Sequence, residues 1–238
     1  MKLDILVLAA HPDDAELGCA GTIISHIAQG KKVGVVDYTR GELGTRGTSE
    51  KRLEEAKESS ELMGLTIREN LNFKDGFFVN DEKHQMAVIR AIRQYKPDIV
   101  LANAVSDRHP DHGKAAQLAT DACFYSGLMK IESEFDGQTQ EAWRPKAVYH
   151  YIQSRYIVPD IVVDISGFWQ RKMEAVLAYK SQFHNPNSNE PGTFISSPEF
   201  LHMLEARAKD FGHSIGVEYG EGYTNERCPG IKDLTTLL

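Results

Sequence analysis

The chain has 238 residues and a formal net charge of −7, with 41% hydrophobic and 26% charged residues. This length can enclose a substantial core, and the composition is that of an ordinary globular protein, which excludes collagen-like, coiled-coil and disordered classes. The negative charge and the lack of a basic tract argue against nucleic-acid binding, because such proteins neutralise phosphates with clustered lysine and arginine. We therefore expect a single domain over residues 1–238 and no nucleic-acid partner.

Cysteine usage and the N-terminal run indicate the compartment. Cys19, Cys123 and Cys228 are an odd number without close spacing, which suits a reducing compartment better than a disulfide framework. The apolar run over residues 3–10 is too short to span a bilayer and has no signal-peptide cleavage pattern. We expect a cytoplasmic protein without a membrane partner, whose chain opens with a buried strand.

The first half of the chain alternates apolar, β-branched runs with segments of helical period, as βαβ units do. Predicted strands cover residues 4–10, 32–38, 67–73 and 98–102. Predicted helices cover residues 16–29, 50–63, 82–95 and 112–125. The pattern predicts an α/β fold, a Rossmann-like three-layer sandwich with a mostly parallel sheet and helices on both faces.

The pattern loosens beyond residue 126. Further strands are predicted over residues 146–152 and 159–165, and further helices over residues 167–179 and 198–211. Residues 184–197 between these two helices are rich in Pro, Asn, Ser and Gly, which predicts a surface loop that is able to cover a site.

Two His-Pro-Asp turns each follow a predicted strand. The first, His11 to Asp14, places a histidine and two carboxylates together, a combination that suits zinc, and its three-residue step lets His11 and Asp14 reach one ion at about 2 Å. The second, His109 to His112, follows the fourth predicted strand. Because loops after neighbouring parallel strands open at the same edge of a sheet, the second turn is expected to supply the third ligand.

The alternative interpretation is that each His-Pro-Asp turn only caps a helix through its aspartate. That interpretation leaves unexplained why two histidines and three further acids gather in the same turns. For Glu16, an interaction with the dipole of the following helix remains an alternative to a functional role, and for Cys19 a buried structural thiol is favoured over a metal ligand.

The paired turns resemble those of the LmbE-like, or PIG-L-like, zinc deacetylases, which remove acetyl groups from N-acetylglucosamine derivatives. The similarity runs almost end to end and includes Thr39-Arg40-Gly41-Glu42, Arg52 with Glu55, and residues 179–183 and 219–223. The loop over residues 41–47 is similar to that of family members that act on N-acetylglucosaminyl L-malate in bacillithiol biosynthesis.

The resemblance implies a role for each matching residue. It implies one zinc ion per subunit, held by His11, Asp14 and His112, with Asp13 as the general base. It also implies that His109 and Asp111 form a supporting pair. We expect Asp111 to accept a hydrogen bond from the His109 ring and to keep that ring cationic.

The groups that stabilise the oxyanion and bind the substrate are less defined by the sequence. Some relatives use a tyrosine at the oxyanion, but the late predicted helix offers Phe200 and the position two before His109 holds Asp107, which leaves protonated His109 as the candidate donor. An acidic substrate needs a cationic partner, and the candidates are Arg46, Arg52 and Arg108, with surface ion pairs as the alternative. The resemblance implies that Arg52 faces the substrate.

The rival functions belong to different classes. A nucleotide-binding protein is disfavoured because the first turn lacks Gly-x-Gly-x-x-Gly and carries acids that repel pyrophosphate. A two-metal phosphoesterase is disfavoured because the ligand set fills one zinc site and leaves few spare carboxylates. A metal-binding module without catalysis remains open, although a spare carboxylate beside the ligands favours an enzyme, and so does a deacetylase of another N-acetylglucosamine derivative, such as an N-acetylchitooligosaccharide. We expect a small sugar substrate, and the resemblance implies a homo-oligomer, with hexamers among the relatives.

Overall fold

The computed structural model describes residues 1–183 and 189–237. A seven-stranded sheet consists of β1 (Ile5–Ala9), β2 (Val33–Thr39), β3 (Ile67–Phe73), β4 (Ile99–Ala102), β7 (Ala147–Tyr151), β8 (Ile161–Asp164) and β9 (Gly220–Asn225). The helices are α1 (Asp14–Ala28), α2 (Ser49–Met63), α3 (Glu82–Tyr95), α4 (Pro110–Tyr125), α5 (Trp169–Leu177) and α6 (Pro198–Ser214). Two short 3₁₀ helices, η1 (Ser166–Phe168) and η2 (Leu234–Thr236), and a ribbon of β5 (Glu134–Phe135) and β6 (Gln138–Thr139) complete the described elements.

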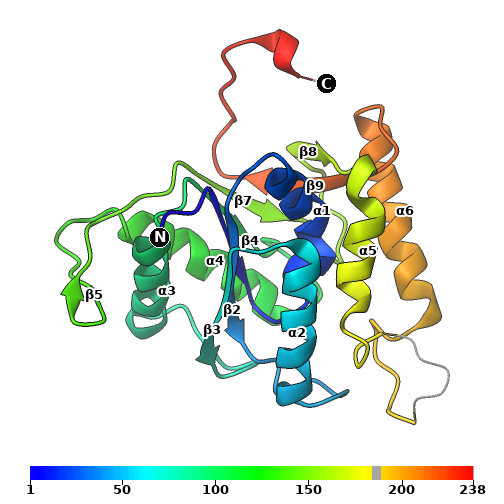
Figure 1. Ribbon diagram of the computed structural model, residues 1–238, viewed down its shortest axis with the longest axis horizontal. Helices are drawn as coiled ribbons and strands as arrows, with labels where there is room; N and C mark the ends of the chain where they lie inside the picture. The colour runs from blue at the N-terminus through cyan, green and yellow to red at the C-terminus, as the bar shows by residue number, and fades with distance from the viewer. Residues whose placement is uncertain (184–188, 238) are drawn as a thin grey trace.

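The sheet has the strand order β3-β2-β1-β4-β7-β9-β8, and it is parallel from β3 to β7. Helices α3 and α4 cover one face, while α1, α2 and α5 lie on the other (Figure 1). The predicted α/β architecture, with a mostly parallel sheet between two helical layers, is confirmed.

Strand β1 shows why a continuous apolar run forms the centre of this sheet. Its side chains alternate between two cores: Leu6 and Leu8 pack on the side of α3 and α4, while Ile5 and Val7 pack on the side of α1. All four are buried, as expected for a parallel strand covered on both faces. The carboxyl ends of β1 and its neighbour β4 therefore come together at one edge.

The sequence pattern did not predict β9, which pairs antiparallel with both β7 and β8. Its sequence is rich in glycine because α6 lies directly over it. A Cβ atom at Gly222 would stand 2.9 Å from the Phe211 ring, and one at Gly220 would stand 2.9 Å from the backbone nitrogen of Gly212. Close contact between helix and strand therefore replaces the alternating apolar pattern by which strands are usually predicted.

The predicted loop over residues 184–197 is described only from residue 189 onward, and residues 184–188 lie outside the described part of the chain. Residues 189–197 contain neither helix nor strand, as predicted. Among the described residues, the structure has no helix with the length and apolar character needed to cross a membrane.

Candidate active site

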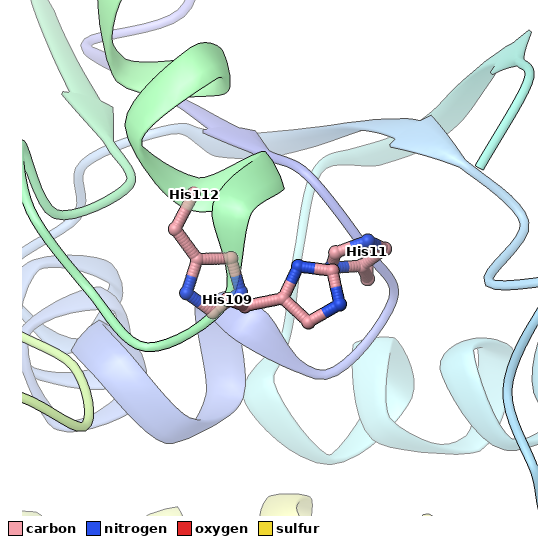
Figure 2. Close-up of side chains that lie close together, drawn as sticks. All are labelled: His11, His109 and His112. Atoms are coloured by element: carbon pink, nitrogen blue, oxygen red, sulfur yellow. The ribbon is translucent and has the colours of Figure 1, made fainter. Parts of the chain in front are cut away.

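The two His-Pro-Asp turns meet at the carboxyl edge of the sheet. His11 follows β1, and His109 caps the N-terminus of α4, which carries His112 one turn further on. Figure 2 shows the three imidazole rings close together, and the ring centroids of His11 and His109 are 4.7 Å apart, while those of His109 and His112 are 5.2 Å apart. Adjacent parallel strands thus bring together residues that are about a hundred positions apart in the sequence.

The Asp14 carboxylate lies between the two outer histidines of this group. Its Oδ2 is 3.4 Å from Nδ1 of His11, and its Oδ1 is 3.1 Å from Nε2 of His112. Asn103 donates to Oδ2 at 3.0 Å and Gln153 donates to Oδ1 at 2.9 Å, so the carboxylate is held in a fixed orientation. The three residues expected to hold a metal ion are therefore neighbours in space.

The ring nitrogens that face away from Asp14 are also engaged by carboxylates. Nε2 of His11 is 3.1 Å from Asp75 and 3.4 Å from Asp111, and Nδ1 of His112 is 2.6 Å from Asp107. Carboxylates in this position orient a metal-binding imidazole and make it more basic.

These surroundings favour positive charge at both histidines. Burial alone would lower the pKa of His11, but hydrogen bonds to neighbouring carboxylates hold it well above its usual value. Burial is likewise outweighed at His112, where the charge of Asp14 and the bond to Asp107 raise the pKa to about 9. A divalent cation would satisfy the same buried carboxylates, so this set of nitrogen and oxygen donors fits zinc.

Other combinations of the same side chains could also hold an ion. Donor atoms of His11, His109 and His112 lie within 4.8 Å of one another, and so do donor atoms of His11, Asp75 and Asp111. His11 belongs to both groups, and the structure therefore makes it the common member of every candidate ligand set found among the described residues.

Asp13, the expected general base, is buried beside these donors. Its backbone has a φ of 106°, a left-handed conformation that is rare outside glycine and marks a constrained position. Arg52 donates to its Oδ2 at 2.8 Å. Burial raises the pKa of Asp13 to about 6, although the charge of Arg52 opposes the rise.

The structure corrects the expected pairing of His109 with Asp111. The Asp111 carboxylate accepts hydrogen bonds from the backbone nitrogen of Gly76 and from Lys114, and it lies against His11, whereas His109 accepts a bond from the Asp111 backbone. Burial and the charges of His11 and His112 lower the pKa of His109. His109 is therefore neutral near pH 7, not cationic as expected, because Asp111 occupies the first turn of α4 and turns its carboxylate elsewhere.

The three arginines expected at the substrate lie in different surroundings. Arg52 and Arg108 line the cavity beside the histidines, and the guanidinium carbon of Arg108 lies 4.2 Å from the ring centroid of Phe194. Arg46 is engaged elsewhere: its Nε donates to the carbonyl oxygen of Ser181 at 3.0 Å, and it is not among the described residues that line the cavity.

This cavity has a volume of about 320 Å³ and opens over the histidine cluster. Its walls include the apolar side chains of Leu17, Leu43, Phe194 and Phe200, together with Asp13, Asp14 and the three histidines. A larger hollow of about 840 Å³ lies elsewhere, beside Asp4, Ile5 and Tyr149, and neither His-Pro-Asp turn reaches it. The smaller cavity is therefore the candidate active site.

Sequence reasoning missed several residues of this site. Asp75, Asn103 and Gln153 each follow a strand closely, at the carboxyl edge, so the same strand-end rule that identified the two turns could have found them. Arg207 also lines the cavity, but it comes from the middle of α6, where no sequence pattern distinguishes it from surface arginines.

Comparisons with known proteins place the chain in a family. The family model PIG-L, described as GlcNAc-PI de-N-acetylase, matches residues 6–123, which include both His-Pro-Asp turns. The chain is 29% identical over 189 residues to the diacetylchitobiose deacetylase of Thermococcus kodakarensis, covering 75% of this chain and 70% of that protein. It is 30% identical over 125 residues to the uncharacterized deacetylase YaiS of Escherichia coli, covering 50% of this chain and 67% of that protein.

Among solved structures, the conserved protein TT1542 from Thermus thermophilus superimposes with a TM-score of 0.87 and 35% sequence identity, covering 98% of each chain. Sequence similarity, fold and the placement of the paired turns thus agree with one another. This chain belongs to the PIG-L, or LmbE-like, deacetylase family.

Proposed function

We propose that this chain is a zinc-dependent N-deacetylase, with one zinc ion held by His11, Asp14 and His112, and that it converts N-acetylglucosaminyl L-malate to glucosaminyl malate and acetate. The observation that carries the proposal is the position of Asp14, whose two carboxylate oxygens face His11 and His112. The buried carboxylate of Asp13 belongs to the residue directly before it. The diacetylchitobiose deacetylase of Thermococcus kodakarensis supports removal of an acetyl group from an amino sugar.

A zinc ion bound by these three residues supplies a Lewis acid that polarises the acetamide carbonyl and makes a water molecule acidic. The carboxylates of Asp75, Asp107 and Asp111 fix the rings of the two ligand histidines, which keeps their donor nitrogens in place. The protein thus provides an orienting shell for the ligands as well as the ligands themselves.

Asp13 transfers the proton in this scheme. It takes a proton from the attacking water as the carbon–oxygen bond forms, and it returns that proton to the amide nitrogen as the carbon–nitrogen bond breaks. A pKa near 6 suits both steps, because the group is ionised at neutral pH and still basic enough to accept a proton. Arg52 holds the carboxylate in place.

Neutral His109 is the proposed donor to the developing oxyanion. Its ring lies 4.7 Å from that of His11, centroid to centroid, and it lines the cavity where the acetamide has to lie. A neutral imidazole still carries one N–H, so the donor role does not require the cationic form.

The proposed function is tested by metal analysis combined with mass detection of acetyl loss. We expect about one zinc ion per chain and release of acetate from N-acetylglucosaminyl L-malate, compared with free N-acetylglucosamine and diacetylchitobiose. Asp13→Ala should keep its zinc and lose turnover by about 10²- to 10⁴-fold. Zinc-loaded protein that releases no acetate from any of the three compounds would refute the proposal.

A further inference from the structure

Arg207 projects from α6 into the cavity and differs from the other cationic groups there. It is partly buried, and within the described part of the chain no hydrogen bond or ion pair engages its guanidinium. Burial lowers the pKa of Arg207 to about 10, even though the charges of Asp107 and Glu221 oppose the change. Partial burial of a guanidinium without an anion in contact is unfavourable, because hydration is lost and no protein group replaces it.

The two acids nearest in electrostatic terms are already committed to other partners. Asp107 accepts from the His112 ring and from the backbone of Arg155. Glu221 accepts from Lys172 and from two backbone nitrogens in α1. The charge of Arg207 is therefore not neutralised by direct contact within the described part of the protein.

Arg52 provides an internal comparison, because it lines the same cavity and is also shielded from water. Burial would lower its pKa too, but the Asp13 carboxylate at 2.8 Å raises the pKa above the usual arginine value. Among the arginines of the cavity, Arg52 has a carboxylate from the protein, and Arg108 is exposed and lies over the Phe194 ring. Arg207 is partly buried and has no carboxylate in contact among the described residues. Arg207 is therefore the partly buried arginine of the cavity whose guanidinium is available to a carboxylate of the ligand.

We propose that Arg207 binds a carboxylate on the group attached to the acetylated sugar, so that the preferred substrates are acidic conjugates of N-acetylglucosamine and not neutral oligosaccharides. A guanidinium matches a carboxylate with two parallel hydrogen bonds. Arg108 lies at the same cavity, stacked on Phe194, and adds positive charge on that side. This inference rests on the proposed function and names the residue that selects its substrate.

The size of the cavity supports a small acidic conjugate. About 320 Å³ is at the low end of ligand-binding cavities, which suits one sugar ring with a small substituent. The catalytic carboxylate of Asp13 and the free guanidinium of Arg207 both line this space, so one ligand of that size can contact both.

The experiment compares N-acetylglucosaminyl L-malate with its dimethyl ester, which has the same sugar and lacks both negative charges. The wild-type protein should prefer the acid over the ester, measured as a ratio of kcat/KM values. Arg207→Gln should lower this preference by about 10- to 100-fold, mainly through KM, because a charge-assisted pair is lost in ground state and transition state alike. Arg207→Lys should restore part of the preference.

Lys209→Gln is the matched control, because it removes one positive charge two residues further along α6 from an exposed side chain that pairs with Glu205. It should keep the wild-type preference. A preference that is unchanged in Arg207→Gln, whatever the loss in absolute rate, would overturn the inference, and so would an equal change in Lys209→Gln.

Binding to the metal-free protein separates this inference from the proposed function. Calorimetric titration with the acid should show a dissociation constant raised by about the same factor in Arg207→Gln, and the ester should bind the two proteins equally. If the zinc-loaded wild-type protein turned over neither compound, the proposed function would fail. The binding difference between acid and ester would still decide for or against Arg207.

Discussion

The two His-Pro-Asp turns have the same three residues but place their aspartates in opposite situations. Asp13 lies before α1 in a left-handed conformation, contacts one arginine, and has a pKa raised to about 6 by burial. Asp111 lies inside the first turn of α4, where bonds to His11, Lys114 and a backbone nitrogen hold its pKa well below the usual value. The same motif therefore provides a proton acceptor in one turn and a permanent anion in the other.

The histidines of the two turns differ in the same way. His11 has acids on both ring nitrogens, whereas His109 has the imidazoles of His11 and His112 as its neighbours and caps a helix. What distinguishes the turns is the point at which the helix begins: at Asp14 in the first and at Pro110 in the second. The residue at which the helix begins therefore decides whether the aspartate lines the cavity, as Asp13 does, or supports a neighbouring histidine, as Asp111 does.

The largest effect should follow from removing a proposed ligand. His112→Ala takes away one of the two nitrogen donors next to Asp14, so bound zinc should fall from about one to near zero per chain and acetate release should become undetectable. Elemental analysis and the acetate assay measure both quantities. His202→Ala, an exposed position on α6, is the control and should keep both; full zinc content in His112→Ala would contradict the ligand assignment.

The next effect sharpens the contrast between the two aspartates. Asp13→Asn should keep its zinc and lose about 10²- to 10⁴-fold in kcat, because the proton acceptor is gone. Asp111→Asn should instead weaken zinc binding by about 10- to 100-fold, because His11 loses an orienting carboxylate. Competition with a chelator measures the affinity. Identical behaviour of the two variants would remove the distinction drawn between the turns.

A smaller effect concerns pH. Asp13 accepts a proton only when ionised, so kcat/KM should fall as the pH drops through its pKa. The charge of Arg52 holds that pKa down, and Arg52→Leu should therefore move the acid limb of the profile to higher pH by about one unit or more. Arg52→Lys keeps the charge and should move it less. A limb that moves to lower pH in Arg52→Leu would show that the titrating group is not Asp13.

The smallest effect is expected at Lys114, which pairs with Asp111 from a side chain that is 38% exposed. Exposed ion pairs contribute roughly 0.2–1 kcal/mol, so Lys114→Met should change the free energy of unfolding and the zinc affinity little. Denaturant unfolding and chelator competition measure the two. A loss of zinc affinity as large as that of Asp111→Asn would contradict this expectation. It would mean that Lys114, and not His11 with the Gly76 backbone, keeps the Asp111 carboxylate ionised and in position.

Much of the fold was predictable because the first half of the chain is locally consistent. The strand over residues 67–73 and the helix over residues 82–95 match the sequence prediction residue for residue, and no other boundary in that half shifts by more than two residues. The two turns could be predicted to meet because each follows an apolar run, and parallel strands align their carboxyl ends.

The features that were not predicted depend on contacts between segments far apart in the sequence, and no local sequence pattern reports such contacts. Strand β9 owes its sequence to the helix packed over it, and Arg207 gains its significance from the lack of a contacting partner among the described residues. The orientation of Asp111 could not be inferred from its place near His109, because its position in the first turn of α4 directs its carboxylate toward His11.

The glycines of β9 have a consequence for substrate choice. They let α6 pack close to the sheet, and α6 carries Arg207 at the cavity, so the spacing between helix and sheet affects where the guanidinium lies. A methyl group at Gly220 would stand 2.9 Å from the backbone nitrogen of Gly212 and would push the helix away from the sheet. Changes at the sheet could thus retune which conjugates are accepted while every metal-binding side chain stays the same.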